Sequence, residues 1–221
     1  MPRLLDGALG ERLELSAYYA DFLDNYKRAS EFWKLERGQD FAEPNSDNWR
    51  AFDRGDWEES LRLSEARRAE LLDSRRRDAA RGMTSRRVRI VSLPPSDYVL
   101  WEMYPLKIRD EVGEAINILL DSEVADLEAD GPLPDLILMD TGVMYEIIYD
   151  SNGVADHSLR YTDKVLVQRC RDFVADLFWR GESIGAFFER EIAHLPSPRP
   201  ARQALPHDYF ERVGRPIPPR T

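Results

Sequence analysis

Residues 86–97 have the sequence RRVRIVSLPPSD, and this stretch decides the fold class. Its first half alternates in part between arginine and β-branched residues, a pattern typical of a β-strand. Arg87 and Arg89 alternate with Val88 and Ile90, so both arginines are expected to point to one face of that strand. The Pro-Pro pair then ends the strand, because proline has no N–H group to donate to a ladder of hydrogen bonds.

Further strand patterns follow this stretch. Residues 115–120 form an apolar run of strand length. Two apolar runs, 136–140 and 143–149, flank Thr141-Gly142 and predict a β-hairpin. A turn after the hairpin then predicts a short strand over 155–159. We therefore expect a mixed sheet of about five strands, all of them between residues 86 and 160.

Helical patterns occupy the rest of the chain. Apolar residues recur at spacings of three and four over 8–37, which predicts one long helix or two short ones. A second helix is expected over 56–81, and a final one over 161–193 with a break near Gly181. The pattern of residues 98–104 does not fix their type of structure. The order of these elements predicts an α+β or α/β fold with N-terminal helices and a C-terminal helix.

Composition divides the chain into three regions. Residues 1–85 are expected to form an N-terminal helical region packed on the sheet, and residues 86–194 an α/β domain. Residues 195–221 are rich in proline and arginine, so we expect an extended tail there.

The net charge of −10 limits the kinds of partner that this chain binds. An acidic surface disfavours generic attraction to nucleic acid and to anionic membranes. The single cysteine, Cys170, excludes an internal disulfide and a cysteine-based zinc site. We see neither a signal peptide nor an apolar run long enough to span a bilayer. These observations predict a cytoplasmic protein without direct contact to nucleic acid or membrane.

The common catalytic motifs are missing from this sequence. We find no phosphate-binding GxxxxGK[ST] or GxGxxG loop, no GxSxG elbow and no HxK pair. The three histidines, His157, His194 and His207, do not have the spacing of metal ligands. We therefore predict no catalytic residue, no cofactor and no metal, and we favour a protein that is not an enzyme.

The segment after the prolines carries the candidate site. A helical placement would stack Asp97 and Tyr98 over Trp101 and Glu102 on one face. Two interpretations stay open. In the first, these side chains form the wall of a ligand pocket. In the second, the two rings belong to the core and Glu102 satisfies an arginine such as Arg89.

These residues resemble the signature of a known family. Residues 86–98, followed by Trp101-Glu102, resemble an actinobacterial family of uncharacterised proteins, domain of unknown function 6879. The likeness continues forward to residue 153 and backward to the stretch 32–37, and it covers roughly residues 20–180.

The resemblance implies a regulatory role. Members look like free-standing relatives of the ligand-sensing domains behind helix-turn-helix segments of transcription regulators. The fold implied is a degenerate phospholipase-D-like layer without the catalytic His-Lys pair. This chain has Leu100, Arg109 and Asn117 where the family usually has arginine, asparagine and arginine. If these positions line a pocket, its ligand differs here or the pocket is lost.

Our main hypothesis is a non-enzymatic regulatory or accessory protein. It would bind a partner protein, expected to be a helix-turn-helix transcription regulator, together with a small ligand. The alternatives are an enzyme acting on a phosphate-bearing or peptide substrate and an acidic, antitoxin-like neutralising partner. The residues predicted to bind ligand or partner are Arg87, Arg89, Asp97, Tyr98, Trp101 and Glu102, with Glu36 and Arg37 as supports.

Overall fold

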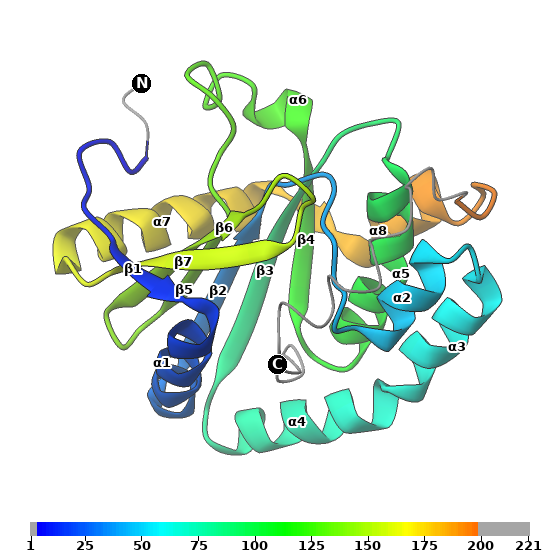
Figure 1. The fold of residues 1–221 in the computed structure, drawn as a ribbon, viewed down its shortest axis with the longest axis horizontal. Helices are drawn as coiled ribbons and strands as arrows, with labels where there is room; N and C mark the ends of the chain where they lie inside the picture. The colour runs from blue at the N-terminus through cyan, green and yellow to red at the C-terminus, as the bar shows by residue number, and fades with distance from the viewer. Residues whose placement is uncertain (1–3, 199–221) are drawn as a thin grey trace.

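The computed structural model describes residues 4–198 and builds them around one eight-stranded mixed sheet with helices on both faces (Figure 1). The mixed α/β class predicted from the sequence is confirmed. The proposed tail lies almost entirely in residues 199–221, outside the described residues. No helix within 4–198 has the length and apolar character needed to cross a membrane.

The central strands of the sheet run parallel and its flanks are antiparallel. The strand order is β1-β7-β6-β5-β2-β3-β4-β8. Strands β2, β3 and β4 are parallel to one another, whereas each remaining neighbouring pair is antiparallel. The strands are β1 Glu11–Glu14, β2 Glu31–Glu36, β3 Thr84–Val91, β4 Ala115–Leu120, β5 Leu136–Met139, β6 Val143–Tyr149, β7 Ala155–Tyr161 and β8 Glu182–Ser183.

The predicted strands are all present, but the prediction that every strand lies between 86 and 160 is wrong. Strands β1, β2 and β8 lie outside that range, and β2 falls inside the predicted helix 8–37. The helix ends at Arg28, and from residue 31 the side chains alternate between the two faces of the sheet. Trp33 and Leu35 fit both the helical spacing of three to four residues and the two-residue alternation of a strand. Their burial against the helix that follows β7 favours the strand.

The helices are also shorter than predicted. Instead of one helix over 56–81 there are two, with a bend at Arg67. The bend allows the first helix to pack on the helix after β3 and the second to lead back to the start of β3. The helices are α1 Leu15–Arg28, α2 Asp47–Asp53, α3 Trp57–Ala66, α4 Arg68–Ala80, α5 Asp97–Glu111, α6 Asp121–Val124, α7 Lys164–Arg180, α8 Ile184–Phe187 and the π-helical turn Phe188–Ile192.

The break near Gly181 is confirmed, and its cause lies in the sheet. Helix α7 ends at Arg180, and the next two residues form β8 along the edge of β4. A Cβ atom at Gly181 would lie 2.8 Å from the carbonyl oxygen of Ile118, so only glycine permits this approach. The chain therefore crosses from one face of the sheet to its edge at this residue.

The undetermined element after the two prolines is helix α5. Its N-terminus is capped by Ser96, whose side-chain oxygen accepts a hydrogen bond from the Val99 amide at 3.1 Å. Most of its side chains from Tyr98 to Leu106 are buried against β4, α3 and α8. The helix therefore belongs to the core of the fold.

The two faces of the sheet differ in chemistry. Helix α7 covers one face with an apolar layer of β2, β3 and β5 side chains. On the other face, α1 packs on the β5–β6 side and α5 packs on the β4 side. Between these two helices, β2 and β3 present charged side chains. The candidate site is built on this charged strip.

The turn at Gly153 fixes the loop that follows β2. The amide of Ala42 donates to the carbonyl of Gly153 at 2.8 Å, and Ala42 forms a parallel bridge with Val154. Gly153 has a φ of +77°, and a Cβ atom there would lie 3.0 Å from the carbonyl oxygen of Asp40.

We expect Gly153→Ala to lower the free energy of unfolding by about 1 kcal/mol more than Gly142→Ala. Both positions have positive φ, which costs an alanine about 1–2 kcal/mol. Only Gly153 has a backbone atom in the way, since the space around Gly142 is open within 4 Å. Urea unfolding of the two variants measures the difference. Equal losses would show that the loop moves away from the turn without cost.

Candidate functional site

Strands β2 and β3 place four charges side by side on the face opposite α7. In the parallel register, Lys34 lies beside Arg87 and Glu36 lies beside Arg89. Aligned residues of neighbouring strands share a face, so the four side chains point the same way. All four are buried. Charges in such a place need partners, because burial without compensation is costly.

The partners form a connected chain of ions. Glu36 binds both Lys34 and Arg87. The Nε atom of Arg87 donates to Glu114 at 2.8 Å, and the Nε atom of Arg109 donates to the other oxygen of Glu114 at 2.6 Å. No member has a side chain that is more than 10% exposed. We call these five residues the ion-pair chain; it holds three cations and two carboxylates.

Electrostatics within the ion-pair chain keep its members charged. Burial would raise the pKa of Glu114, but Arg109 and Arg87 outweigh burial and lower that pKa to about 2. Burial would lower the pKa of Arg87, but Glu114 and Glu36 outweigh it and hold the pKa above its usual value. Arg109 differs: burial, together with repulsion from Arg87 and Arg75, outweighs Glu114 and lowers its pKa.

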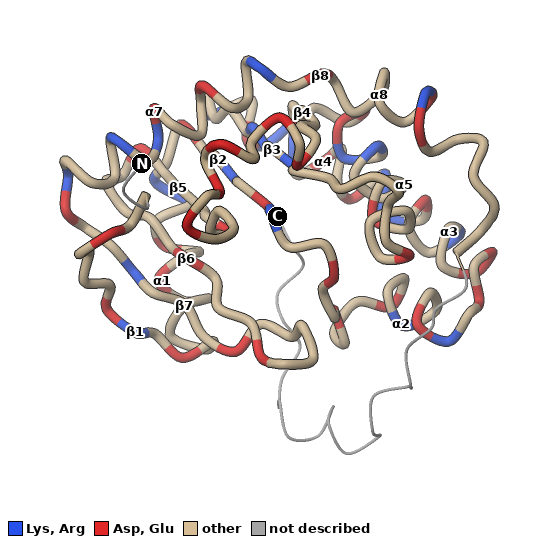
Figure 2. The backbone as a smooth tube through the Cα atoms, turned by 90° about the horizontal axis from the view of Figure 1, so that it is seen from above, with Lys and Arg blue, Asp and Glu red and all other residues tan. Residues whose placement is uncertain are grey.

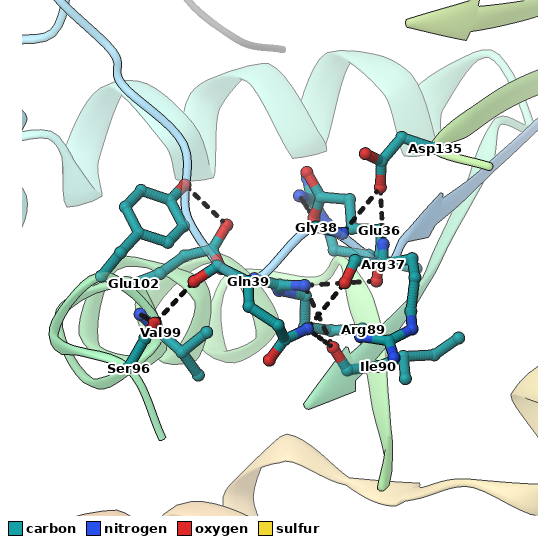
Figure 3. Close-up of polar contacts among 12 residues, drawn as sticks. Glu36, Arg37, Gly38, Gln39, Arg89, Ile90, Ser96, Val99, Glu102 and Asp135 are labelled. Atoms are coloured by element: carbon teal, nitrogen blue, oxygen red, sulfur yellow. Dashed lines mark hydrogen bonds and ion pairs between the residues drawn. The ribbon is translucent and has the colours of Figure 1, made fainter. Parts of the chain in front are cut away.

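A second buried pair lies beside the ion-pair chain (Figure 3). The Nε atom of Arg89 donates to Glu102 at 2.8 Å, and its Nη1 atom donates to the backbone carbonyls of Glu36 at 3.3 Å and Ile90 at 3.1 Å. The hydroxyl of Tyr98 lies 3.1 Å from the other oxygen of Glu102. The structure thus shows the second of the two arrangements, in which Glu102 satisfies Arg89.

The loop after β2 crosses the carboxyl ends of the parallel strands. Asp135 accepts hydrogen bonds from the amides of Arg37 at 2.5 Å and Gly38 at 3.3 Å (Figure 3). Burial outweighs these amides and raises the pKa of Asp135. The Gln39 side chain binds the Ile90 carbonyl at 2.8 Å, and the Gln39 carbonyl accepts from the hydroxyl of Ser96 at 2.5 Å. The loop is therefore fixed to β3 and to the start of α5.

A cavity of about 430 Å³ lies over the charged strip. We call it the sheet cavity. Helices α1 and α3, which contribute to its walls, stand on opposite sides of the sheet centre (Figure 2). Lys34 and Arg87 are its buried cations. The walls are made by aromatic and aliphatic side chains of α1, α3 and β6 and by the loop before α2, including Tyr18, Tyr19, Phe22, Pro44, Leu63, Ile147 and Tyr149.

The structure gathers most of the predicted site residues but places only Arg87 on the cavity wall. Glu36, Arg89, Tyr98 and Glu102 lie together beneath or beside it, joined by the hydrogen bonds described above. The remaining three residues have other surroundings: Trp101 is a core residue with its indole N–H 2.8 Å from Ser60, Arg37 binds Glu128 through two hydrogen bonds of 2.6 and 2.8 Å, and Asp97 is exposed in the first turn of α5.

The positions where this chain departs from the family pattern do not line the sheet cavity. Leu100 is part of the core around α5. Arg109 ends the ion-pair chain, and Asn117 donates to the carbonyl of Phe178 at 2.8 Å. All three positions lie in α5 or β4, on the β4 side of the sheet.

Sequence reasoning missed Lys34 and the aromatic wall of α1. The alternation of Phe32, Lys34 and Glu36 with Trp33 and Leu35 was the available signal for Lys34. It would have placed Lys34 on the face of Arg87 once the two strands were paired. Tyr18 and Tyr149 carry no local signal, because only the folded sheet brings them together.

The comparisons with known proteins bear on this site. A family model described as "Domain of unknown function (DUF6879)" matches residues 19–189. The chain belongs to this family. The resemblance stated from the sequence is thereby confirmed, and the DUF6879 match includes the whole ion-pair chain. Comparison with the curated proteins finds no significant match.

The candidate site of this DUF6879 chain holds buried charges that are fixed by ion pairs. Within residues 4–198, no group of three or more His, Cys, Asp or Glu side chains is arranged to hold a metal ion. The sheet cavity combines apolar walls with a few oriented polar groups, as small-molecule sites do.

We expect Arg87→Met to lower the free energy of unfolding by about 3–5 kcal/mol, because it leaves two buried carboxylates without their shared cation. Arg28→Met is the matched control, since Arg28 forms an exposed pair with Asp24 and should cost under about 1 kcal/mol. Chemical denaturation of both variants measures the two losses in the free energy of unfolding. Similar losses would mean that the ion-pair chain does not stabilise the sheet.

The lowered pKa of Glu114 predicts a specific dependence on pH. The folded-state pKa is below the unfolded value, so the stabilisation is present above about pH 4.5 and is lost as the pH falls toward 2. Wild type should therefore exceed Glu114→Gln in stability at pH 7, and the two curves should converge toward pH 2 at up to about 1.4 kcal/mol per pH unit. Parallel curves in denaturant titrations would contradict this assignment.

Proposed function

We propose that this DUF6879 protein is a non-enzymatic binding protein that holds a small ligand in the sheet cavity and communicates with a partner protein. The observation that carries the proposal is the cavity itself. Its volume of about 430 Å³ is within the usual range for small-molecule sites, roughly 300–1,000 Å³. The expected partner is a helix-turn-helix transcription regulator, which the family resemblance implies.

The construction of the cavity supports binding rather than packing as its role. Its buried end is held in place by the ion-pair chain, and its loop wall is fixed by the Ala42–Gly153 contact. A site preformed in this way avoids the cost of ordering itself around a ligand. The predicted residues then have distinct roles: Arg87 contacts the ligand, whereas Glu36, Arg89, Tyr98 and Glu102 hold the floor.

The position of the cavity supports a link to a partner. An occupant would touch Tyr19 on α1 and Leu63 on α3, and both helices have exposed outer faces. A ligand that prefers one arrangement of these helices shifts the population toward it, and a partner bound to their outer faces senses the shift. The fold relation implied by the resemblance, a degenerate phospholipase-D-like layer, stays a prediction beside this proposal.

A cavity-filling variant tests the proposal. The neutral fluorescent probe N-phenyl-1-naphthylamine should bind wild type with saturation at one site. Ile147→Trp puts an indole ring into the cavity wall and should weaken binding at least about tenfold. Ile148→Trp is the matched control, because Ile148 is the next residue of β6 and points to the other face. It should bind the probe like wild type.

Absence of saturable binding to wild type, or equal binding by the two variants, would overturn the ligand-binding proposal. The partner is tested separately, by affinity capture of the full-length protein at physiological salt with identification by mass spectrometry. A stoichiometric helix-turn-helix regulator supports the accessory role. Failure to recover a stable partner would remove that part of the proposal.

A further inference from the structure

We propose that the sheet cavity selects ligands that carry one anionic group on a flat aromatic body, with the anion bound at Lys34 and Arg87. The inference rests on the proposed function and names the class of ligand. It follows from the distribution of charge and of aromatic side chains over the cavity lining.

The charges of the lining are segregated by depth. The two cations on the sheet, Lys34 and Arg87, are only 8% and 3% exposed. The exposed acids of the lining are Asp47, the first residue of α2, and Glu70 in the first turn of α4, which begins after the partly buried cation Arg67. The half-buried Glu43 instead accepts a hydrogen bond of 2.7 Å from the hydroxyl of Tyr98 on the floor. The buried end of the cavity is therefore cationic and its open end is mainly acidic.

The buried end favours an anion more than a neutral group. An ammonium group has three N–H donors, so Lys34 can bind Glu36 and the anionic group of a ligand together. Within the ion-pair chain three cations face two carboxylates. Burial is the main cause of the lowered pKa of Arg109, and repulsion from Arg87 and Arg75 adds to it. An added anion relieves this repulsion, and charge-assisted hydrogen bonds are stronger in a buried site than in water.

The open end limits the charge of the ligand. A second anionic group at that end would lie near the exposed carboxylates of Asp47 and Glu70 and would be repelled. Polyanions such as nucleoside triphosphates are thereby disfavoured. The change from cationic side chains at the buried end to acidic ones at the open end also orients the ligand, with its anionic group toward the sheet.

The walls fit a planar ring. Tyr18 and Tyr19 of α1 line the cavity with ring centroids 5.0 Å apart, and Tyr149 of β6 lines it while packing on Phe41 at 4.5 Å. Ile137 and Ile147 add apolar surface to the lining. Aromatic groups bind well between such rings in offset or edge-on geometry. A flat body therefore buries more surface here than a bulky or strongly polar one.

A pair of isosteric competitors tests the class of ligand on the full-length protein. We would displace bound N-phenyl-1-naphthylamine with 1-naphthoate and, separately, with 1-naphthamide, which differ in charge but hardly in shape. The carboxylate should compete at least about tenfold better on wild type. Equal competition would overturn the inference while leaving the cavity a ligand site. Failure of the probe itself to bind would instead overturn the proposed function.

Two lysine variants locate the anion. Lys34→Met should reduce the preference for 1-naphthoate to within about threefold while the neutral probe still binds. Lys107→Met is the matched control, because Lys107 pairs with Glu111 and Glu189 on α5 and the π-helical turn, and it should keep the full preference. An unchanged preference in folded Lys34→Met would overturn the assignment of Lys34. The wild-type competition decides the ligand class even if that variant fails to fold.

Discussion

Glu36 and Glu114 are buried carboxylates that each bind two cations, and the centre of the molecule is arranged around them. Strand β3 places two buried arginines on one face of the sheet, and burial of such charges without partners would be prohibitive. The parallel pairing of β2 brings Glu36 beside them, and Glu114 is supplied by the turn that leads into β4. Helix α5 adds Glu102 for the second arginine. The pairing of β2 and β4 with β3, together with the position of α5, thus gives both buried arginines their carboxylate partners.

This need of buried charges for partners also explains why this face of the sheet is not fully packed. Apolar helices cover a sheet closely when its face is apolar, as α7 does on the opposite side. Over the charged strip, α1 and α5 instead pack on the two apolar flanks of the sheet. The space between them becomes the sheet cavity, with cations at its buried end and aromatic rings on its walls. The ion-pair chain that holds the strands together and the proposed binding site therefore share residues.

Membership of the DUF6879 family by itself specifies no chemistry, so the functional argument depends on the site. Half of the eight residues picked out from the sequence support the floor of the cavity, and only Arg87 reaches its lining. A binding role and a structural role are linked in such an arrangement, since a ligand at Arg87 also contacts the network that stabilises the sheet.

Local signals in the sequence were enough to predict β3, β4, the β5–β6 hairpin and β7: the partial alternation of β3, the apolar runs of β4, β5 and β6, and the turn residues around the hairpin and before β7. The sequence by itself also determined that Arg87 and Arg89 share a face. Only the tertiary structure decided β2, since residues 31–36 fit a helical spacing as well as a strand until α7 buries Trp33 and Leu35. The cavity, too, was decided by the tertiary structure. Its walls come from α1, α3 and β6, and a contact between segments so distant in the chain leaves no local pattern in the sequence.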